Sequence, residues 1–411
     1  MLDARPQQTA ARLFGGFLAL DRSIWRLAFA RAINTLGFSL VMPFMALYLV
    51  RERGASGTTF GLIYLLSGLV AAAGQAVAGE LTDRIGRRRV MIGGLALRFV
   101  QMACLGLAVI HHAPIALVGA LVIGAGLLRA IFEPPASAAI AELATPAQRP
   151  AAFALQRVGV NFGWAFGPAL GGALATWSFG GTFFLAAPAT LLAILAILPI
   201  PDGRRAPRAP REPLSLRSLA AALRENRPFA IYLVLVLCGS LLTVQLFSTL
   251  TVFASTELHL PESDVGLLYT VNGVLVVLLQ APAVAIAGAW GMRRTLVIGA
   301  LLYAAAYLLF GAADGFVGLA VGMSILTAGE VLFAPALTDL AATLGNPERM
   351  GRAFGLFGFV QSLGLSLGPL LGGAVYDGLR TEHLAMWGLF AAGMALVAAA
   401  YAVLGRRYAL F

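Results

Sequence analysis

Apolar runs of about 20 residues or more recur along the whole of this 411-residue chain. A helix of that length crosses roughly 30 Å of hydrocarbon. The chain is 59% hydrophobic and only 12% charged, whereas soluble proteins average about 25% charged residues. A soluble core cannot hold so many apolar side chains, and the strict polar–apolar alternation of a membrane β-barrel is absent. We therefore expect an all-α membrane protein.

The runs divide into twelve predicted membrane spans. The first has no convincing cleavage site and is too long for the hydrophobic region of a signal peptide, so we expect it to remain as a helix. The spans cover residues 25–50, 58–80, 90–110, 113–143, 152–176, 180–200, 229–253, 264–289, 293–312, 316–343, 352–375 and 384–404.

One long polar stretch, residues 201–228, interrupts the spans and is rich in Pro and Arg. That composition is typical of a linker. We expect an N-terminal six-helix bundle in residues 1–200, a basic cytoplasmic linker in 201–228, and a C-terminal six-helix bundle in 229–411.

Arginine supplies all 29 basic residues of the chain, and the net charge is +10. In the loops and at the ends of the spans, 21 arginines fall on one side of the membrane and 3 on the other. The positive-inside rule then places both termini in the cytoplasm, which predicts a bacterial-type inner-membrane protein. Because the basic residues gather in loops between spans, the charge indicates no nucleic-acid partner.

The absence of Lys excludes two kinds of chemistry. A G-x-x-x-x-G-K-[ST] phosphate loop requires Lys, so a nucleotide-driven pump of that type is not encoded, and neither is a Lys Schiff base. The two cysteines, Cys104 and Cys238, lie inside apolar runs and indicate neither a disulfide nor a metal site. We expect no metal and no cofactor.

The two halves of the chain are internal repeats. Residues 61–89 align without a gap with 266–294 at an offset of 205, and 132–173 align with 333–374 at an offset of 201. Each half has an even number of spans, so the two halves are parallel repeats. That architecture predicts a substrate site between two bundles near mid-membrane, with access alternating between the two sides.

The same decad, G-x-x-x-G-P-x-x-G-G, occupies residues 163–172 in the fifth predicted span and 364–373 in the eleventh. In lipid, neighbouring helices can satisfy the carbonyl that proline frees, and small residues four apart let helices approach closely. We expect a helix-packing motif in both halves, comprising Gly163, Gly167, Pro168, Gly171, Gly364, Gly368, Pro369 and Gly372.

The string GELTDRIGRRR, residues 79–89, joins the second and third predicted spans on the cytoplasmic side. Glycine allows close helix packing and a turn here, and we expect the arginines to face anionic lipid head groups. A positive-inside loop with a capping Asp would also explain the string. However, it resembles the G-x-L-x-D-R-x-G-R-[RK] signature of the major facilitator superfamily (MFS), whose loop latches two bundles in the outward-open state. The implied latch residues are Gly79, Asp83, Arg84, Gly86, Arg87 and Arg88.

The resemblance covers the whole chain and implies the MFS fold, with twelve transmembrane helices in two pseudo-symmetric six-helix bundles, usually as a monomer. Leu36-Gly37 and Pro43 in the first span resemble the pattern of drug:proton antiporters with twelve spans. The first decad resembles the fifth-span motif of the same branch, although helix packing alone also explains it. The resemblance further implies that spans 5 and 11 pack against spans 8 and 2.

Charged residues in the middle of a span cost at least ~2.5–3.5 kcal/mol and are functional candidates. Arg129 and Glu133 lie four apart in the fourth span, and Glu330 in the tenth occupies the repeat position of Arg129. The resemblance implies that spans 1, 4, 7 and 10 line a central cavity. Burial disfavours a charged carboxylate, so Glu330 is our first candidate for proton coupling. We expect Glu133, a second candidate, to be held near Arg129, unless that pair is only structural. The resemblance further implies that Arg129 relays between Asp83 and the cavity.

Other polar residues in the spans are weaker candidates. Arg98 lies deep in the third span and has no evident partner, whereas Arg26, Arg31 and Arg157 lie near cytoplasmic ends and should snorkel to the surface. Candidate cavity residues, each of which could instead bond a neighbouring helix, are Asn34, Tyr64, Asn161, Gln245 and Tyr269.

We therefore expect a transporter rather than an enzyme: a proton-coupled secondary active exporter of amphipathic or cationic small molecules, of the drug:proton antiporter type. Its partners would be the substrate, protons and the lipid bilayer, with the proton gradient as the energy source. An exporter of a defined sugar, amino acid or lipid remains open, as do an uncoupled facilitator and a sensor or scaffold of the same fold. Glu330 disfavours the last two, because neither needs a titrating acid.

Overall fold

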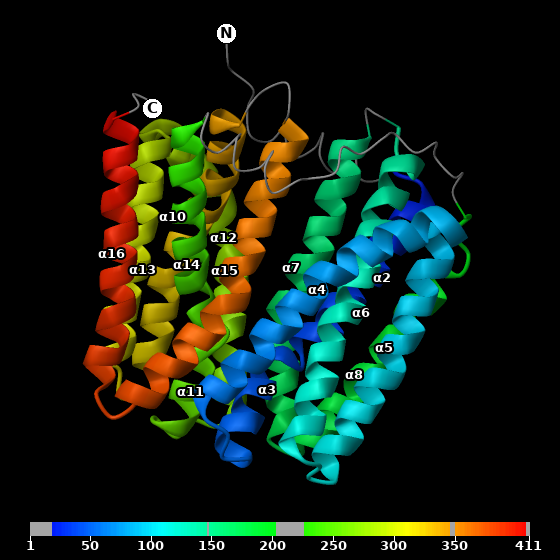
Figure 1. Cartoon of the computed structure of the whole chain (residues 1–411), viewed down its shortest axis with the longest axis horizontal. Helices are drawn as coiled ribbons and strands as arrows, with labels where there is room; N and C mark the ends of the chain where they lie inside the picture. Colours follow the sequence, from blue (N-terminus) through cyan, green and yellow to red (C-terminus); the bar gives the residue numbers. More distant parts are fainter. Residues whose placement is uncertain (1–18, 146–147, 203–225, 346–349, 408–411) are drawn as a thin grey trace. The chain divides into compact units, whose positions relative to one another are not determined.

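A computed structural model gives the structure of residues 19–145, 148–202, 226–345 and 350–407 (Figure 1). These residues are almost entirely helical, and none of them forms a strand. The elements are α2 (Arg22–Ser39), α3 (Met42–Leu47), the π-helical turn η1 (Tyr48–Glu52), α4 (Gly57–Ile85), α5 (Arg87–Ile110), α6 (Ile115–Leu143), α7 (Arg149–Ala175), α8 (Phe179–Ile197), α10 (Arg227–Thr243), the 3-10 turn η2 (Val244–Leu246), α11 (Thr249–Thr256), α12 (Glu262–Trp290), α13 (Met292–Ala312), α14 (Phe316–Leu344), α15 (Met350–Leu379) and α16 (His383–Arg407).

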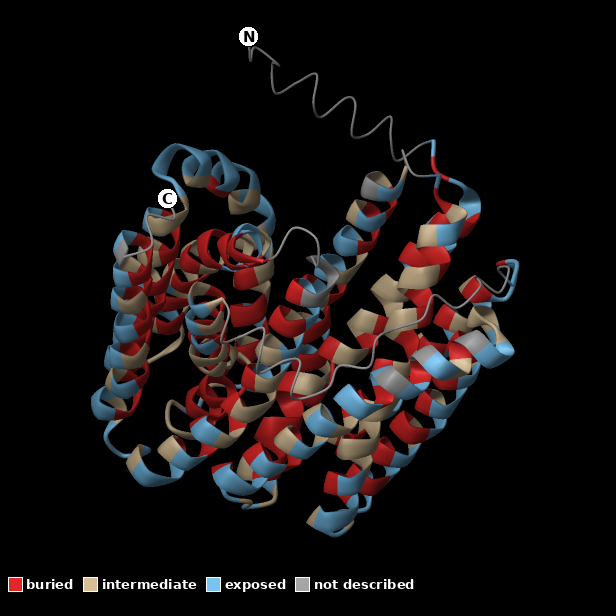
Figure 2. Cartoon of the chain, turned by 45° about the horizontal axis from the view of Figure 1, so that its top comes forward, coloured by how far each residue is buried: buried red, intermediate tan, exposed pale blue. Residues whose placement is uncertain are grey.

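Within the described residues, eleven helical stretches are long and apolar enough to cross a membrane. The remaining predicted span, residues 152–176, is occupied by α7, a helix of 27 residues that is about 40 Å long. Large apolar side chains remain exposed, for example those of Leu195, Val277 and Leu396. Exposed positions recur along the helices (Figure 2). Lipid is the solvent that suits such faces. The prediction of an all-α membrane protein is confirmed.

The chain forms two compact units. Unit 1 comprises Met1–Phe44 and Leu69–Pro207, and unit 2 comprises Met45–Gly68 and Arg208–Phe411. The predicted bundles, 1–200 and 229–411, follow the order of the spans. The units differ from them mainly because Met45–Gly68 packs with the second half of the chain. Most of the predicted linker, residues 203–225, lies outside the described residues.

Unit 1 is built around α2 and α5. Helix α2 packs against α7 and α8, and α5 packs against α6 and α8. Asp21 caps α2 by accepting a hydrogen bond from the backbone N–H of Ser23 at 2.7 Å, and this bond lowers the pKa of the Asp21 carboxyl. The buried core at this end includes Ile24, Leu27 and Phe132.

Unit 2 is built around α13 and α14. Helix α13 packs against α14 and α16, α10 packs against α15, and α12 packs against α14. Trp387 of α16 is fully buried, and its ring contacts the rings of Tyr307, Phe310 and Phe390. Close aromatic packing of this kind positions α13. Tyr303 of α13 then contacts Phe333 of α14, and Tyr307 contacts Leu242 of α10.

The first and seventh predicted spans are both broken helices. The first consists of α2, α3 and η1, and the seventh consists of α10, η2 and α11. The repeat offset of 205 aligns the second break, Val244–Leu246, with residues 39–41 at the end of α2. The breaks are therefore a symmetric feature of the two halves.

Side chains satisfy the carbonyls freed by the break in the seventh span. Tyr307 donates from its hydroxyl to Leu242 O at 2.5 Å, and Tyr269 donates to Leu246 O at 2.8 Å. Gln245 Nε2 donates to the carbonyl of Leu241 at 2.7 Å. Irregular backbone inside a membrane persists only where protein groups meet its hydrogen-bonding needs. These side chains hold the break in place.

The glycines of the first decad bring α7 against α2. A side chain at Gly163 or Gly167 would collide with α2, and one at Gly171 would collide with the break that follows α2 and with α3, so glycine is required at all three. Ser39 of α2 donates to the carbonyl of Gly163 at 2.7 Å. The residues of the first span that these glycines meet are Thr35, Leu36, Ser39, Leu40 and Phe44.

The second decad repeats this contact in unit 2. Gly364, Gly368 and Gly372 of α15 face α10 and the turns that follow it. The residues they meet are Leu237, Ser240, Leu241, Val244, Gln245 and Thr249. Five of these are the counterparts, at an offset of 205, of the first-span residues that the first decad meets.

Two expectations for the decads have different outcomes. Pro168 and Pro369 lie inside helices, as expected. The expectation that span 11 packs against span 2 is confirmed, since Gly57 and Gly61 of α4 meet Gly373 and Leu370 of α15. The decad glycines spaced by four meet spans 1 and 7 instead. The expected contact between spans 5 and 8 is not tested and stays a prediction.

The hydrogen bond from Tyr307 to the break in the seventh span predicts that two tyrosines of α13 contribute differently to stability. Replacing Tyr307 by Phe leaves the Leu242 carbonyl without that donor, and we expect it to lower the free energy of unfolding by about 1–3 kcal/mol. Tyr303→Phe is the matched control, because the Tyr303 hydroxyl makes no hydrogen bond with any described residue. Thermal unfolding of the purified protein in detergent measures both. Equal effects of the two substitutions would contradict this role for Tyr307.

Candidate functional site

Glu330 is the central residue of α14, about 21 Å from either end of the helix. Its Oε2 accepts a hydrogen bond at 2.8 Å from Nδ2 of Asn272 on α12. Tyr303 and Tyr307 of α13 lie within electrostatic reach of the carboxylate. Among the described residues, no arginine or histidine forms an ion pair with it. A carboxylate at this depth without a cation has the environment expected of a group that binds and releases a proton.

The partners of Glu330 were not predicted from the sequence. Asn272 uses its amide twice, donating to Glu330 and, at 2.9 Å, to Oγ1 of Thr327. Thr327 lies three residues before Glu330 in α14 and in turn donates to the Met323 carbonyl. The sequence contained one indication of this contact, a single Asn within the apolar run of α12, because a buried amide requires a hydrogen-bond partner.

Arg129 is the central residue of α6, as Glu330 is of α14. Its guanidinium carbon lies 5.1 Å from the centroid of the Phe38 ring of α2, a cation–π contact. The side chain is exposed, and no described residue forms a hydrogen bond or an ion pair with it. The repeat thus places opposite charges at equivalent depths in the two units.

Glu133 pairs with Arg31 of α2 and not with Arg129. The expected Arg129–Glu133 pair is therefore wrong, and so is the expectation that Arg31 snorkels to the surface. Arg31 also donates to Oε1 of Gln156 on α7 at 2.6 Å, which links α2, α6 and α7. An acid that follows a base by four residues is the weaker order for a helical pair, so a partner on α2 wins.

Arg98 is buried, with 2% of its surface exposed, and it donates to Oδ1 of Asn34 at 2.8 Å. Its guanidinium lies 5.6 Å from the Phe38 ring, on which Arg129 also lies. The predicted cavity residue Asn34 is itself buried and serves as the partner of this arginine. A neutral amide offers Arg98 a hydrogen bond but leaves its charge uncompensated.

The other predicted cavity residues are divided between helix contacts and exposed positions. Gln245 is fully buried, and besides the Leu241 carbonyl it donates to the Gly368 carbonyl at 2.9 Å. Tyr269 is buried and bonds the break in the seventh span. Tyr64 is buried beside Phe60 and within electrostatic reach of Tyr269, its repeat counterpart. Asn161 is exposed on α7. For Gln245 and Tyr269, the geometry favours a role in helix contacts.

The cytoplasmic loop between α4 and α5 contains the turn expected at Gly86. Gly86 has φ +94°, and its repeat counterpart Gly291 has φ +76°, values that favour glycine strongly. Each precedes the first residue of a helix, α5 or α13. The conformational role predicted for Gly86 is confirmed in both halves.

The arginines of this loop bond within unit 1. Arg87 pairs with Glu142 at the end of α6, and Arg88 donates to the Leu198 carbonyl at the end of α8 at 3.1 Å. Arg84 pairs with Glu80 one turn earlier at 2.5 Å. The expectation that Arg87 and Arg88 face lipid is wrong: both lie beside a cavity of about 310 Å³ between α5, α6 and the end of α8.

The latch role predicted for Gly79 and Asp83 is not tested by the structure. Both residues lie in α4, but their side chains fall outside the described part of the structure. The latch role of this loop remains a prediction.

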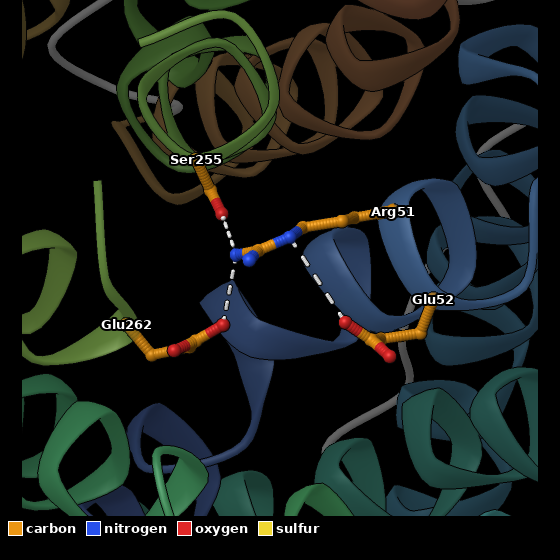
Figure 3. A network of polar contacts seen from close by, with 4 residues as sticks. All are labelled: Arg51, Glu52, Ser255 and Glu262. Carbon is orange, nitrogen blue, oxygen red and sulfur yellow. Dashed lines mark hydrogen bonds and ion pairs between the residues drawn. The ribbon is translucent and has the colours of Figure 1, made fainter. Parts of the chain in front are cut away.

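Within unit 2, polar side chains form a network around Arg51 of η1 (Figure 3). Arg51 donates to Oγ of Ser255 on α11 at 2.6 Å and to Oε1 of Glu262 at the start of α12 at 2.9 Å. Glu52 lies at 4.0 Å from its Nε. The network attaches the end of the first span to the seventh and eighth.

Asp377 of α15 fastens the start of α4 in the same unit. Its carboxylate accepts from the backbone N–H of Gly57 at 2.7 Å, from the N–H of Thr58 at 2.8 Å and from the Thr58 hydroxyl at 2.6 Å. Free N–H groups at the N-terminus of a helix favour a carboxylate there. Together, Arg51 and Asp377 explain why Met45–Gly68 belongs to unit 2.

Comparison with known proteins shows the family. The model of the Major Facilitator Superfamily matches residues 27–262 and 233–409. The chain belongs to the major facilitator superfamily. Similar MFS proteins include the uncharacterized MFS-type transporter YttB of Bacillus subtilis, 28% identical over 89% of this chain and 92% of that protein. The quinolone resistance protein NorA of Staphylococcus aureus is 26% identical over 87% of this chain and 91% of its own length.

Solved structures confirm the MFS fold. The nucleoside transporter NupG superposes with a TM-score of 0.78 at 16% identity, over 93% of this chain and 98% of that one. A transporter of the POT family superposes with a TM-score of 0.74 at 14% identity, over 95% of this chain and 99% of the other. At such identities the likeness concerns the fold alone.

The cap at Asp377 predicts a local effect in this MFS protein. We expect Asp377→Ala to reduce the protection of the Gly57 and Thr58 amides by about 0.5–2 kcal/mol, the usual value of an N-terminal cap. Hydrogen–deuterium exchange of peptides covering residues 53–60 measures it. Glu382→Ala, an exposed acid near the same helix end, is the control. Unchanged exchange in Asp377→Ala would show that other contacts hold this segment.

Proposed function

We propose that this MFS protein is a proton-coupled exporter, which exchanges protons for amphipathic small molecules, cations among them, by alternating access. The observation that carries the proposal is Glu330, a carboxylate at the centre of α14 without an ion-pair partner among the described residues. An uncompensated charge at this depth costs free energy, which protonation removes. A transporter that moves solute without protons has no use for such a group.

Asn272 gives the proposed proton site two states. With Glu330 ionised, the Asn272 amide stabilises the carboxylate by the hydrogen bond at 2.8 Å. With Glu330 protonated, the same amide retains its bond to Thr327, so it stays in place while the proton is bound. The exchange of proton for substrate then changes the charge of unit 2 without disturbing its packing.

Alternating access is proposed because the chain belongs to a family of transporters. The first and second spans each have one part in unit 1 and one part in unit 2, and the unit 2 parts are held by Arg51, by Asp377 and by close packing of Gly57 and Gly61 on α15. We propose that the loop at Asp83 closes the cytoplasmic side in one state of the cycle.

The likeness to NorA supports a drug as the exported compound, because that relative is named for quinolone resistance. Glu133, held by Arg31, is a second proton site in this proposal, and Arg129 relays between the cavity and Asp83. We further propose a monomer in a bacterial inner membrane, with both termini in the cytoplasm, since the arginine bias predicts that orientation. Protease or reporter fusions at the termini test the orientation.

The proposal predicts loss of coupling in Glu330→Gln. In inverted vesicles with an imposed pH gradient, we expect gradient-driven uptake of quinolones and lipophilic cations to fall at least about tenfold, because Gln cannot carry a proton. Glu330→Asp keeps the carboxylate and should keep part of the uptake. Asp339→Asn, an exposed acid of the same helix, is the matched control.

Three outcomes separate this function from its alternatives. Undiminished gradient-driven uptake by Glu330→Gln would remove Glu330 from the mechanism. Uptake that ignores the gradient in the wild type would indicate a facilitator. Failure of every drug together with gradient-driven movement of one sugar, amino acid or lipid would indicate a metabolite exporter.

A further inference from the structure

We infer that Arg129 is an anion-binding residue, and that the transported compounds include some with an acidic head group, a carboxylate or sulfonate, on an aromatic or apolar body. This inference rests on the proposed transport function and names one class among its amphipathic substrates. It starts from the charges inside unit 1.

The spans of unit 1 hold more positive than negative charge at depth. Arg31, Arg98 and Arg129 are three guanidinium groups, and Glu133 is the one carboxylate described among them. Glu133 is bonded to Arg31, and the hydrogen-bond partner of Arg98 is the neutral Asn34. Glu133 lies within electrostatic reach of Arg98 and Arg129 as well, but one carboxylate cannot neutralise three guanidinium groups.

The other described acids of unit 1 lie at the ends of helices and are already engaged. Glu80 pairs with Arg84, Glu142 pairs with Arg87, and Asp202 accepts from the Arg88 backbone at 3.1 Å. Asp21 caps the start of α2. Arg129 is at the centre of α6, so these acids cannot approach it.

The geometry of Arg129 suits an external ligand. A guanidinium has five N–H donors, and none of those of Arg129 is used by a described residue, whereas Arg31 and Arg98 both donate to side chains. An exposed arginine at mid-span cannot face hydrocarbon without a large cost, so it faces space that water or a ligand can enter. Its planar fork matches a carboxylate or sulfonate by two parallel hydrogen bonds.

Aromatic rings beside Arg129 indicate the body of the ligand. Phe38 lies under the guanidinium, and the Trp164 ring of α7 meets Phe38 edge to face at 6.1 Å. Phe38 is half-buried and also contacts Arg98, so packing fixes the position of the ring. A cation next to an aromatic wall selects compounds with a flat apolar part and an acidic group.

An anionic lipid offers the same chemistry as a soluble compound. Arg129 lies about 21 Å from either end of α6, whereas lipid phosphates sit at the membrane interface. This depth favours a compound that enters the protein over a lipid that stays in its leaflet. The experiment below includes an arm for each source.

Two fluorescent probes that differ in one group test the site. 8-Anilinonaphthalene-1-sulfonate carries an acidic group, and N-phenyl-1-naphthylamine is the same molecule without the sulfonate. Their binding to purified full-length protein is measured by equilibrium dialysis in a neutral detergent, with protein-free micelles subtracted. The variants are Arg129→Gln, Arg129→Lys and the matched control Arg157→Gln, an exposed arginine of α7.

We expect Arg129→Gln to weaken binding of the sulfonate probe about 10- to 100-fold, the range for a lost charged hydrogen-bond pair. Binding of the neutral probe should change less than about twofold, and Arg129→Lys should be intermediate because it keeps the charge but loses the fork. Arg157→Gln should match the wild type. Equal loss of both probes, or no loss of either, would overturn the inference. Far-UV circular dichroism and the thermal midpoint verify that each variant is folded.

The lipid arm adds short-chain phosphatidylglycerol or phosphatidylcholine as competitors. Displacement of the sulfonate probe by phosphatidylglycerol at equal concentration, with phosphatidylcholine inert, would assign the site to lipid and overturn the substrate assignment. Binding needs no proton gradient, so this test is independent of Glu330→Gln. If probe binding depends on Arg129 but uptake does not depend on the pH gradient, only the proposed function is contradicted. If uptake depends on the gradient and on Glu330 but probe binding does not depend on Arg129, only this inference is contradicted.

Discussion

Every polar group placed in a bilayer must find its partner within the protein, and this constraint explains most of the contacts in this structure. The seventh span is not a continuous helix, and its freed carbonyls are met by Gln245, Tyr269 and Tyr307. Charges follow the same rule, since Arg31 has Glu133 and Arg98 has Asn34. Glu330 has no ion-pair partner among the described residues, and Arg129 has neither a hydrogen bond nor an ion pair among them, which is why a function is proposed for each.

The two halves share a scaffold and differ in charge. Both have a broken helix, a glycine with positive φ before the third helix, and a decad that packs against the broken helix through offset counterparts. At the centre of the fourth helix in each half, one carries Arg129 and the other Glu330. Packing is thus shared by the two repeats, whereas the charge at the centre of the fourth helix is positive in one and negative in the other.

Patterns that depend on local chemistry were predicted well. The apolar runs predicted the helices, Gly86 predicted a turn, and the repeat offsets predicted matching contacts in the two halves. Partners of side chains were predicted poorly. Arg129 and Glu133 are four residues apart, yet Glu133 bonds Arg31, 102 residues away, because helix spacing says which residues share a face but not which neighbour the side chain turns toward. Asn34, Gln245 and Tyr269 were similarly ambiguous, since a polar residue in a span can face a cavity or another helix.

The sequence by itself determined the solvent, the helices, the repeat and the family, because hydropathy over about 20 residues and a gapless repeat are properties of the chain alone. Only the tertiary structure decided that Met45–Gly68 packs with the second half of the chain, and that the decad glycines face spans 1 and 7. It also decided that Arg129 contacts Phe38 and forms no hydrogen bond or ion pair with a described residue. These depend on which helices meet and at what depth. Contacts between distant parts of a chain are set by packing in three dimensions, which spacing along the sequence does not record.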